Sequence, residues 1–167
     1  SDLIARHYGT THTRIFIESK PLLDTLPSVI GAMSEPMVSY DNVGFYLLSK
    51  EVSQHVKVVQ SGQGADEVFA GYHWYQKLQH PNDPVSDYAN AFFGHTEAIV
   101  TGTLAGYNAA REFVQSHFDA NGATDPVDKA LRLDSTVMLV DDPVKRVDNM
   151  TMAWGLEARV PFLDKEV

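Results

Sequence analysis

The sequence of 167 residues contains no cysteine, so it can form no disulfide and offers neither a thiolate metal ligand nor a cysteine nucleophile. It also lacks any apolar run that approaches the roughly 18 residues of a membrane-spanning helix. The first residues lack the basic and apolar regions of a secretory signal peptide. Together these absences favour a cytoplasmic protein with no membrane partner.

Clustered basic residues are absent as well. Asp and Glu number 22 against 13 Lys and Arg, and the formal net charge is −9. No nucleic-acid partner is expected, because binding a phosphate backbone needs clustered cations. An acidic protein can still bind a phosphate group locally, through backbone N–H groups or a bridging metal ion. With 44% apolar residues, the chain can bury a hydrophobic core.

Hydrophobic spacing divides the sequence into an α/β part and an α-rich C-terminal part. Short β-branched segments at residues 13–19 and 56–60 predict two strands. Helices are predicted at residues 3–8, 21–33 and 43–55, from Ala65 onward, and over most of the chain after Pro84. No repeat, low-complexity tract or linker interrupts this order.

Two later helix starts are marked by an aspartate that precedes a proline, at Asp125-Pro126 and Asp142-Pro143. The second helix is expected to end before Pro161, since a residue that precedes proline is pushed toward extended geometry. The side chains that it is expected to bury are Val144, Val147, Met150 and Trp154. The methionines expected to fill the core are Met138, Met150 and Met152.

The stretch VVQSGQGADEVFAGYHWY, residues 58–75, places a loop of small residues between an expected strand and an expected helix. Gly62 and Gly64 carry no Cβ, so a phosphate could approach the backbone N–H groups closely. The pattern is not a Walker loop, which needs Gly-Lys-Ser/Thr. It is not a Rossmann fingerprint either, because Glu67 stands where the third glycine belongs.

Asp66 and Glu67 follow this loop and allow two interpretations. Adjacent carboxylates repel a bare phosphate, but a bridging Mg²⁺ ion binds carboxylate and phosphate oxygens together. Alternatively, the two acids only complement the dipole of the helix that begins near Ala65. That helix is expected to turn Val68 and Phe69 inward.

A second stretch, DDPVKRVDNMTMAWGLEARVPFLD, leads into a segment that Pro161 keeps extended. Residues two apart in extended geometry point to the same side, so Glu157 and Arg159 are expected to share a face. They could form an ion pair that anchors the chain, or a clamp on an anion. The seven histidines are scattered and lack the spacing of a zinc site.

Together the two stretches resemble the asparagine synthetase family. SGQGADEVFAGY is similar to the family's Ser-Gly-Glu-Gly-(Ser/Ala)-Asp-Glu…Gly-Tyr segment. The second stretch is similar to its Val-Asp-Arg…Met-Ala helix followed by Glu-x-Arg-x-Pro-Phe-Leu-Asp, and HYGTTHTRIFIES resembles its Gly-Thr-x-His strand entry. The resemblance spans nearly the whole chain. It implies part of an ATP-pyrophosphatase fold, which is adenine nucleotide alpha hydrolase-like, with few parallel strands.

The resemblance also implies a reaction, such as asparagine synthesis. MgATP converts a carboxylate substrate to an acyl-adenylate, and ammonia derived from glutamine then displaces AMP to give an amide. The implied nucleotide contacts are Ser61, Gly62, Gly64 and Tyr72, and the implied Mg²⁺ ligands are Asp66 and Glu67. The candidate acceptor contacts are Ser39, Tyr40 and Asn42 in EPMVSYDNVGF. Glu157 and Arg159 match the second motif, where an acceptor contact or a structural role is expected.

Two residues depart from the family motifs. Asn149 stands where the family has arginine, with Lys145 and Arg146 nearby. At the catalytic position, Gln63 replaces a glutamate whose carboxylate can accept a proton from incoming ammonia, whereas an amide does not titrate. Either another group takes that proton or the acceptor is not aspartate. Family amidotransferases that act on a small peptide, such as the N-acetylglutaminylglutamine type, resemble this segment more closely, and both acceptors stay open.

The sequence has no counterpart of the family's Ser-Gly-Gly-x-Asp-Ser loop, its N-terminal glutaminase domain or a downstream lysine. We therefore expect residues 1–167 to be the central part of a synthetase domain that is inactive by itself. The alternative that Gln63 allows is a non-catalytic nucleotide-binding or interaction domain of the same fold. A β-lactam or peptide-cyclising synthetase is a third. Exposed strand edges in a partial domain favour a homo-oligomer.

Overall fold

The computed structural model describes residues 2–16, 19–37, 39–93 and 109–166. The protein is α/β and helix-rich, with 63% helix and, in the described residues, a sheet of two parallel strands. The helices are α1 (Asp2–Tyr8), α2 (Ser19–Ala32), α3 (Asn42–Ser53), α4 (Ala65–Phe69), α5 (Trp74–Leu78), α6 (Pro84–Phe93), α8 (Ala109–Asp119), α9 (Pro126–Leu133) and α10 (Lys145–Met152). The strands are β1 (Val58–Gln60) and β2 (Glu157–Arg159), and the short helical turns are η1 (Asp134–Met138), η2 (Val140–Val144) and η3 (Pro161–Leu163).

The chain divides into two compact units. Unit 1 comprises residues 1–59 and 146–158, and unit 2 comprises residues 60–145 and 159–167. Unit 2 contains the glycine-rich loop and most of the helices predicted after Pro84. None of the helices in the described residues is both long and apolar enough to cross a membrane.

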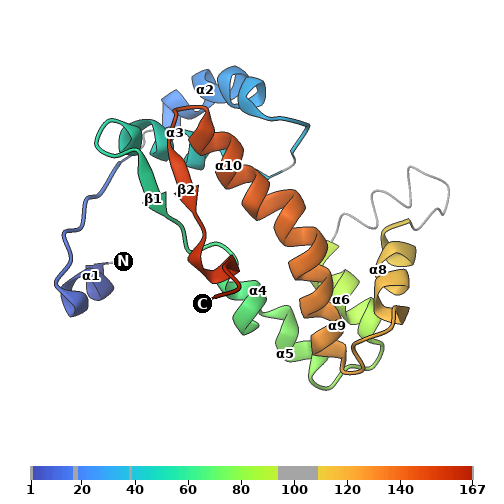
Figure 1. Ribbon diagram of the computed structural model, residues 1–167. Helices are drawn as coiled ribbons and strands as arrows, with labels where there is room; N and C mark the ends of the chain where they lie inside the picture. The colour runs from blue at the N-terminus through green and yellow to red at the C-terminus, as the bar shows by residue number, and fades with distance from the viewer. Residues whose placement is uncertain (1, 17–18, 38, 94–108, 167) are drawn as a thin grey trace. The chain divides into compact units, whose positions relative to one another are not determined.

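The sheet joins the two stretches that carry the sequence motifs, because β1 and β2 lie side by side (Figure 1). The N–H of Glu157 donates to the carbonyl of Lys57 at 2.9 Å, and the N–H of Ser61 donates to the carbonyl of Arg159 at 2.8 Å. Residue numbers rise in the same direction along both strands, so the pairing is parallel. The strand predicted at residues 56–60 and the extended segment at residues 157–159 are confirmed.

The strand predicted at residues 13–19 is wrong. Residues 13–16 have no regular secondary structure, and α2 begins at Ser19. Ile15 is 37% exposed. Alternation of apolar and polar residues favours a strand only where a neighbouring strand and a buried face exist, and the described part of this segment has neither. Residues 17 and 18 lie outside the described residues.

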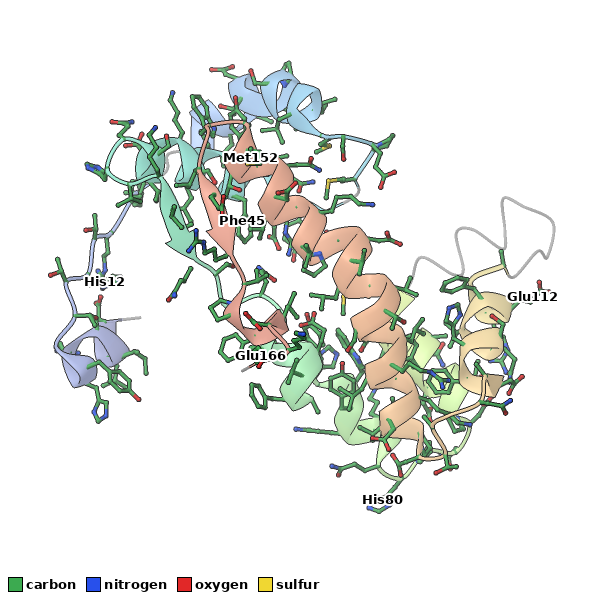
Figure 2. The ribbon with its side chains drawn as sticks, viewed as in Figure 1. His12, Phe45, His80, Glu112, Met152 and Glu166 are labelled. Atoms are coloured by element: carbon green, nitrogen blue, oxygen red, sulfur yellow. The ribbon has the colours of Figure 1, made fainter. Side chains whose placement is uncertain are left out.

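Helices α5, α6, α8 and α9 of unit 2 surround an apolar core. Its buried side chains are Tyr75, Leu78, Val85, Tyr88, Val114, Phe118, Ala130 and Leu133. The rings of Tyr88 and Phe118 lie 5.7 Å apart and join α6 to α8. Polar side chains such as His80 and Glu112 point outward from this unit (Figure 2). Removal of apolar surface from water, at about 25 cal/mol per Å², is the main stabilising contribution in such a core.

A buried carboxylate lies within this core. Asp134 is 0% exposed and accepts hydrogen bonds from Trp74 Nε1 at 3.0 Å, from the Tyr75 hydroxyl at 2.5 Å and from the Tyr88 hydroxyl. Burial raises the pKa of Asp134, although its three hydrogen bonds act in the opposite direction. Burial and the neighbouring Asp134 carboxylate also raise the pKa of Tyr75 and of Tyr88, so both hydroxyls are donors at neutral pH.

Only one of the two predicted Asp-Pro helix starts is present. Asp125 caps α9 by accepting a hydrogen bond from the N–H of Val127 at 2.8 Å, as predicted. The second start is wrong, because Pro143 lies inside the turn η2 and Asp142 begins no new helix. Turns η1 and η2 are π-helical turns, which are wider than α-helical turns. The turn η2 accommodates Pro143, which has no backbone N–H to donate.

Of the four apolar side chains that the helix after Pro143 was predicted to bury, two are buried. Val147 and Met150 are 4% and 0% exposed, while Val144 and Trp154 are half-buried. Met152, predicted to fill the core, is 58% exposed (Figure 2). Met152 is the last residue of α10, so no further turn of that helix covers it.

We predict that Asp134→Asn changes how stability depends on pH. Because the pKa of folded Asp134 is raised, its contribution to stability is complete only below the ordinary aspartate pKa of about 3.9 and is lost as the pH rises through the folded pKa. An amide does not titrate. The free energy of unfolding of the wild type, relative to that of Asp134→Asn, should therefore fall from about pH 4 to about pH 7 in urea unfolding. Asp128→Asn, at an exposed site on α9, should show no such trend, and an Asp134→Asn difference that is equal at both pH values would contradict the prediction.

Candidate functional site

The glycine-rich loop begins where β1 ends at Gln60 and leads directly into α4 at Ala65. In the part of the chain that the structure describes, the N–H groups of Gly62 and Gln63 donate to no other residue. Consecutive N–H groups that face outward in a turn are suited to an anion. The predicted arrangement of strand, small-residue loop and helix is therefore present.

Position 64 requires glycine for two reasons. Its φ is +91°, a backbone conformation that residues with a Cβ rarely adopt. A Cβ built at Gly64 would also overlap the side chain of Leu163 in η3. Next to this contact, the ring of Phe162 meets the ring of Phe69 in α4 edge to face, with 5.9 Å between centroids. The end of the second motif thus packs directly on the loop of the first.

The backbone joins the same two motifs at Ser61. Its N–H donates to the carbonyl of Arg159, so the first residue of the loop is fixed by the last residue of β2. The side chains of Glu157 and Arg159 lie on the exposed face of β2, as their spacing predicted, and each has a partner. Their role as acceptor contacts stays a prediction.

Asp66 lies in the first turn of α4 and is exposed. The chain reverses directly after this helix, where Ala70 adopts a φ of +55° and the N–H of Gly71 donates to the carbonyl of Asp66 at 2.8 Å. A Cβ at Gly71 would overlap the Asp66 carboxylate, so only glycine leaves it room. The left-handed conformation costs Ala70 about 1–2 kcal/mol, and such strain is often found at functional sites.

Glu67 is the inward-facing residue of α4, with 2% of its surface exposed. The reversal at residue 70 brings Tyr72 back to it, and the Tyr72 hydroxyl donates to Glu67 Oε1 at 2.7 Å. Burial and this hydrogen bond raise the pKa of Tyr72. Val68 and Phe69, predicted to face inward, are 51% and 70% exposed. That prediction is wrong, because five residues are too few for periodicity to decide which face of a helix is buried.

The two acids differ in how well they fit Mg²⁺. In nucleotide sites one or two carboxylates bind this ion, and phosphate oxygens and water complete the coordination. Asp66 is exposed beside the loop and fits that role, whereas Glu67 is buried and already accepts a bond from Tyr72. Among the described residues, no three acidic or histidine side chains form a group that could hold a metal ion. The donor set therefore suits an ion that arrives with phosphate.

Of the candidate acceptor residues of unit 1, Ser39 contacts Arg146, which sequence reasoning noted only as nearby charge. Arg146 is 8% exposed, and its Nη1 donates to Ser39 Oγ at 2.6 Å and lies 3.8 Å from Asp41 Oδ2. Asn42 is 1% exposed, and neither polar atom of its amide has a partner among the described residues. Tyr40 is 91% exposed. A buried amide without partners normally costs about 1–3 kcal/mol, so Asn42 marks a place for a bound water molecule or ligand.

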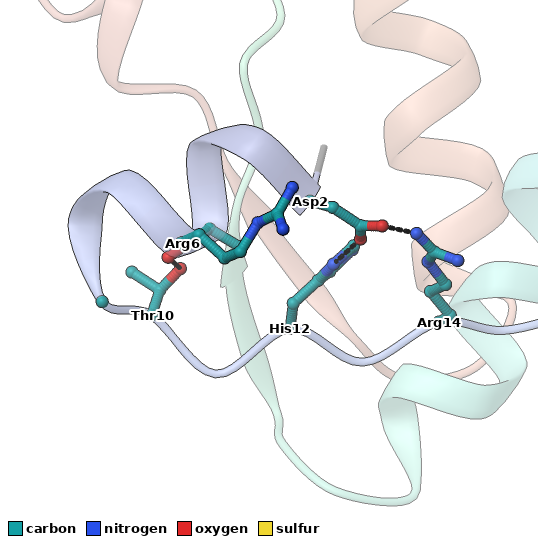
Figure 3. Close-up of a pocket in the computed structure, with 7 residues that line it drawn as sticks. Asp2, Arg6, Thr10, His12 and Arg14 are labelled. Atoms are coloured by element: carbon teal, nitrogen blue, oxygen red, sulfur yellow. Dashed lines mark hydrogen bonds and ion pairs between the residues drawn. The ribbon is translucent and has the colours of Figure 1, made fainter.

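A separate hollow of about 660 Å³ lies beside α1 (Figure 3). The residues that line it are Asp2, Ala5, Arg6, Gly9, Thr10, His12 and Arg14. Within it, the Asp2 carboxylate pairs with Arg14 and lies 2.8 Å from His12 Nδ1. No residue of the glycine loop lines this hollow. It is not the candidate site.

Sequence reasoning gave no role to several residues whose contacts the structure shows. Leu163 was part of the second motif but received no role, and Trp74 was given none either. Asp134 could have been noticed as an acid at a helical position between buried apolar residues. Asn149, which replaces the family's arginine, donates to Ser34 Oγ at 3.1 Å.

We predict that Gly64→Ala destabilises the protein, whereas Gly62→Ala does not. At position 64 the positive φ and the overlap with Leu163 should together lower the free energy of unfolding by about 2–4 kcal/mol. At position 62 a Cβ meets no atom within 4 Å, so the change should stay within about 0.5 kcal/mol. Chemical denaturation of both variants measures the difference. Equal effects of the two substitutions would contradict the proposed packing of Leu163 on the loop.

Comparisons of the sequence with known proteins find asparagine synthetases. Asparagine synthetase [glutamine-hydrolyzing] 1 of Bacillus subtilis (strain 168) is 25% identical over 90% of this chain and 30% of its own length. Asparagine synthetase B [glutamine-hydrolyzing] of Escherichia coli (strain K12) is 28% identical over 98% of this chain and 22% of its own length. Asparagine synthetase [glutamine-hydrolyzing] 1 of Saccharomyces cerevisiae is 28% identical over 98% of this chain and 21% of its own length.

The chain therefore spans less than a third of the length of these relatives. The family model described as asparagine synthase matches residues 1–167, which include both motifs and the sheet that joins them. The chain belongs to the asparagine synthase family.

Proposed function

We propose that this chain is the central part of the synthetase domain of an ATP-dependent amidotransferase. In this reaction a carboxylate oxygen attacks the α-phosphorus of ATP, which gives an acyl-adenylate and releases pyrophosphate. Ammonia then attacks the acyl carbon, which gives an amide and releases AMP and a proton. The observation that carries the proposal is the meeting of the two motifs, where Ser61 pairs with Arg159 and Gly64 packs under Leu163.

The residues of the loop have distinct proposed roles. Ser61 and Gly62 contact the nucleotide, and Gly64 gives the loop the turn that leaves its N–H groups open to phosphate. Asp66 holds Mg²⁺, which would neutralise the charge of pyrophosphate as it leaves. Glu67 supports Asp66 from within the helix. Tyr72 lies beside the site and holds Glu67.

Ser39 and Asn42 are the proposed acceptor contacts that the structure supports best. The Arg146 guanidinium beside Ser39 suits a carboxylate, because its planar group of donors matches two carboxylate oxygens. The unpartnered amide of Asn42 suits a polar group of the same acceptor. Tyr40, Glu157 and Arg159 are further candidates for which the structure gives no comparable support.

We also propose where the full-length protein obtains its ammonia and in which compartment it acts. The full-length protein would obtain its ammonia by hydrolysis of glutamine in a glutaminase domain, as the names of the relatives indicate for those proteins. We propose that it acts in the cytoplasm, where ATP and glutamine are available. The 167 residues alone are expected to have no synthetase activity, and a homo-oligomer stays a prediction.

Gln63 supports a second candidate from another class. The loop retains its glycines and both acids, but an amide at position 63 cannot accept a proton. A domain that binds nucleotide without catalysis would show this combination. Binding of MgATP without release of pyrophosphate by the full-length protein would favour this second candidate.

We predict that Asp66→Asn in the full-length protein lowers pyrophosphate release by about 100-fold or more, because the metal loses its only exposed carboxylate ligand in the loop. Asp128→Asn is the matched control, since Asp128 is also an exposed aspartate in the first turn of a helix in unit 2. A coupled assay for pyrophosphate measures both variants. The proposal is wrong if Asp66→Asn retains the activity of the control.

We predict that the acceptor can be identified by offering the same protein aspartate and, separately, glutamine-containing dipeptides. If Gln63 reflects a peptide acceptor, pyrophosphate release should require a dipeptide, and Gln63→Glu should not improve turnover with it. Release with aspartate alone would exclude the peptide acceptor. No release with either acceptor would favour the non-catalytic alternative.

A further inference from the structure

We propose that Asp134 is a positioning residue of the candidate site, which holds the Glu67 carboxylate beside the glycine loop through Trp74 and Tyr72. The proposal relies on the proposed function only for the role of the loop in binding pyrophosphate. All four residues belong to unit 2, and three contacts connect them in series.

The first contact fixes the indole of Trp74. Its Nε1–H donates to Asp134 Oδ2 at 3.0 Å, and the same oxygen accepts from the Tyr75 hydroxyl. The other oxygen, Oδ1, accepts from the Tyr88 hydroxyl. With both oxygens engaged and no exposed surface, the Asp134 carboxylate cannot rotate without loss of a hydrogen bond. It is therefore a fixed point to which the indole is attached.

The second contact transfers this constraint to Tyr72. Its ring stacks on the Trp74 ring with 4.2 Å between centroids and 18° between planes. A near-parallel stack at this distance allows sliding but opposes rotation of either ring, because rotation separates the two faces. The orientation of Tyr72 thus depends on that of Trp74.

The third contact reaches the loop. The Tyr72 hydroxyl donates to Glu67 Oε1 at 2.7 Å. Glu67 follows Asp66 in α4, the helix that begins directly after the loop. Glu67 is 2% exposed, so rotation into solvent is not available to it without movement of α4. The placement of α4, and with it Asp66 and the end of the loop, is therefore set from the core of unit 2.

Asp134 contributes to stability, because it accepts hydrogen bonds from the buried hydroxyls of Tyr75 and Tyr88. A carboxylate in an apolar core carries a desolvation penalty, and well-packed apolar residues often replace buried charged groups without loss of stability. What an apolar residue cannot do is accept the indole N–H and so fix the plane of Trp74. Besides pairing with the two tyrosine hydroxyls, the acid thus fixes the orientation of Trp74.

Hydrogen–deuterium exchange of the full-length protein tests the proposal without an assay of activity. In Asp134→Ala and in Tyr72→Phe, the backbone amides of residues 61–72 should exchange about five-fold faster or more, since each change removes a hydrogen bond that limits opening of this segment. Asp134→Asn should restore slow exchange. Its amide oxygen can accept from the indole, while its NH₂ group can donate to the Tyr88 hydroxyl, which accepts as well as donates.

Tyr88→Phe is the matched control. It removes a hydroxyl that bonds to the same carboxylate, but the Tyr88 ring packs on Phe118 of α8. The phenyl ring of the variant keeps the contact with Phe118, and Oδ2, which accepts from the indole, keeps both of its donors. Exchange should therefore stay unchanged at residues 61–72. If Asp134→Ala does not fold, as judged by circular dichroism, Trp74→Phe takes its place, because it removes the donor and keeps a ring to stack on Tyr72.

The affinity for magnesium pyrophosphate, measured by calorimetry on the same variants, links the contacts to the site. We expect about five-fold weaker binding in Asp134→Ala and in Tyr72→Phe, and wild-type affinity in Tyr88→Phe and in Asp134→Asn. Unchanged exchange at residues 61–72 in folded Asp134→Ala or Trp74→Phe would overturn the positioning role, as would an equal increase in Tyr88→Phe. A wild-type protein that does not bind magnesium pyrophosphate would overturn the proposed function instead, and the exchange data would still decide the positioning role.

Discussion

The hydrogen bond from the N–H of Ser61 to the carbonyl of Arg159 is the interaction on which the candidate site depends. Two strands that pair in parallel cannot be joined by a tight turn, because the chain must return to the same end of the sheet. Here everything from α4 to α10 forms that connection. The pairing of β1 with β2 therefore joins two segments that lie about 100 residues apart in the sequence.

This pairing explains why the loop and the second motif carry residues of such specific kinds. Gly64 has its left-handed conformation under Leu163, and Phe162 meets Phe69 next to it. The close approach at Gly64 is possible only because that residue has no side chain. The apolar residues of η3 thus pack on the loop as well as forming their own turn. The residues of such a motif serve the packing between distant segments as well as the chemistry of the site.

The sequence allowed the strand at residues 56–60, the loop, the extended segment at Glu157 and the family to be predicted, because each has a strong local pattern. The strand at residues 13–19 failed for the opposite reason, since alternation says nothing about whether a partner strand exists. The inward face of α4 was wrong because one turn of helix has no measurable period. The contacts of Asp134 and Arg146 could not be predicted, because they join residues that are far apart in the sequence.

The arrangement of the loop also limits how the proposed reaction can dispose of its proton. Gln63 does not titrate, Glu67 is buried against Tyr72, and Asp66 is the carboxylate assigned to the metal. None of the three is then placed to act as a general base toward ammonia. At the same time, an amide at position 63 leaves two acids near the loop where a glutamate would make three, which reduces repulsion of a polyphosphate. Glutamine at position 63 thus favours binding of the polyphosphate of ATP. It also removes a possible base from the step in which ammonia attacks. An enzyme with this loop therefore needs a proton acceptor from outside the loop, either another side chain or a group of the substrate itself.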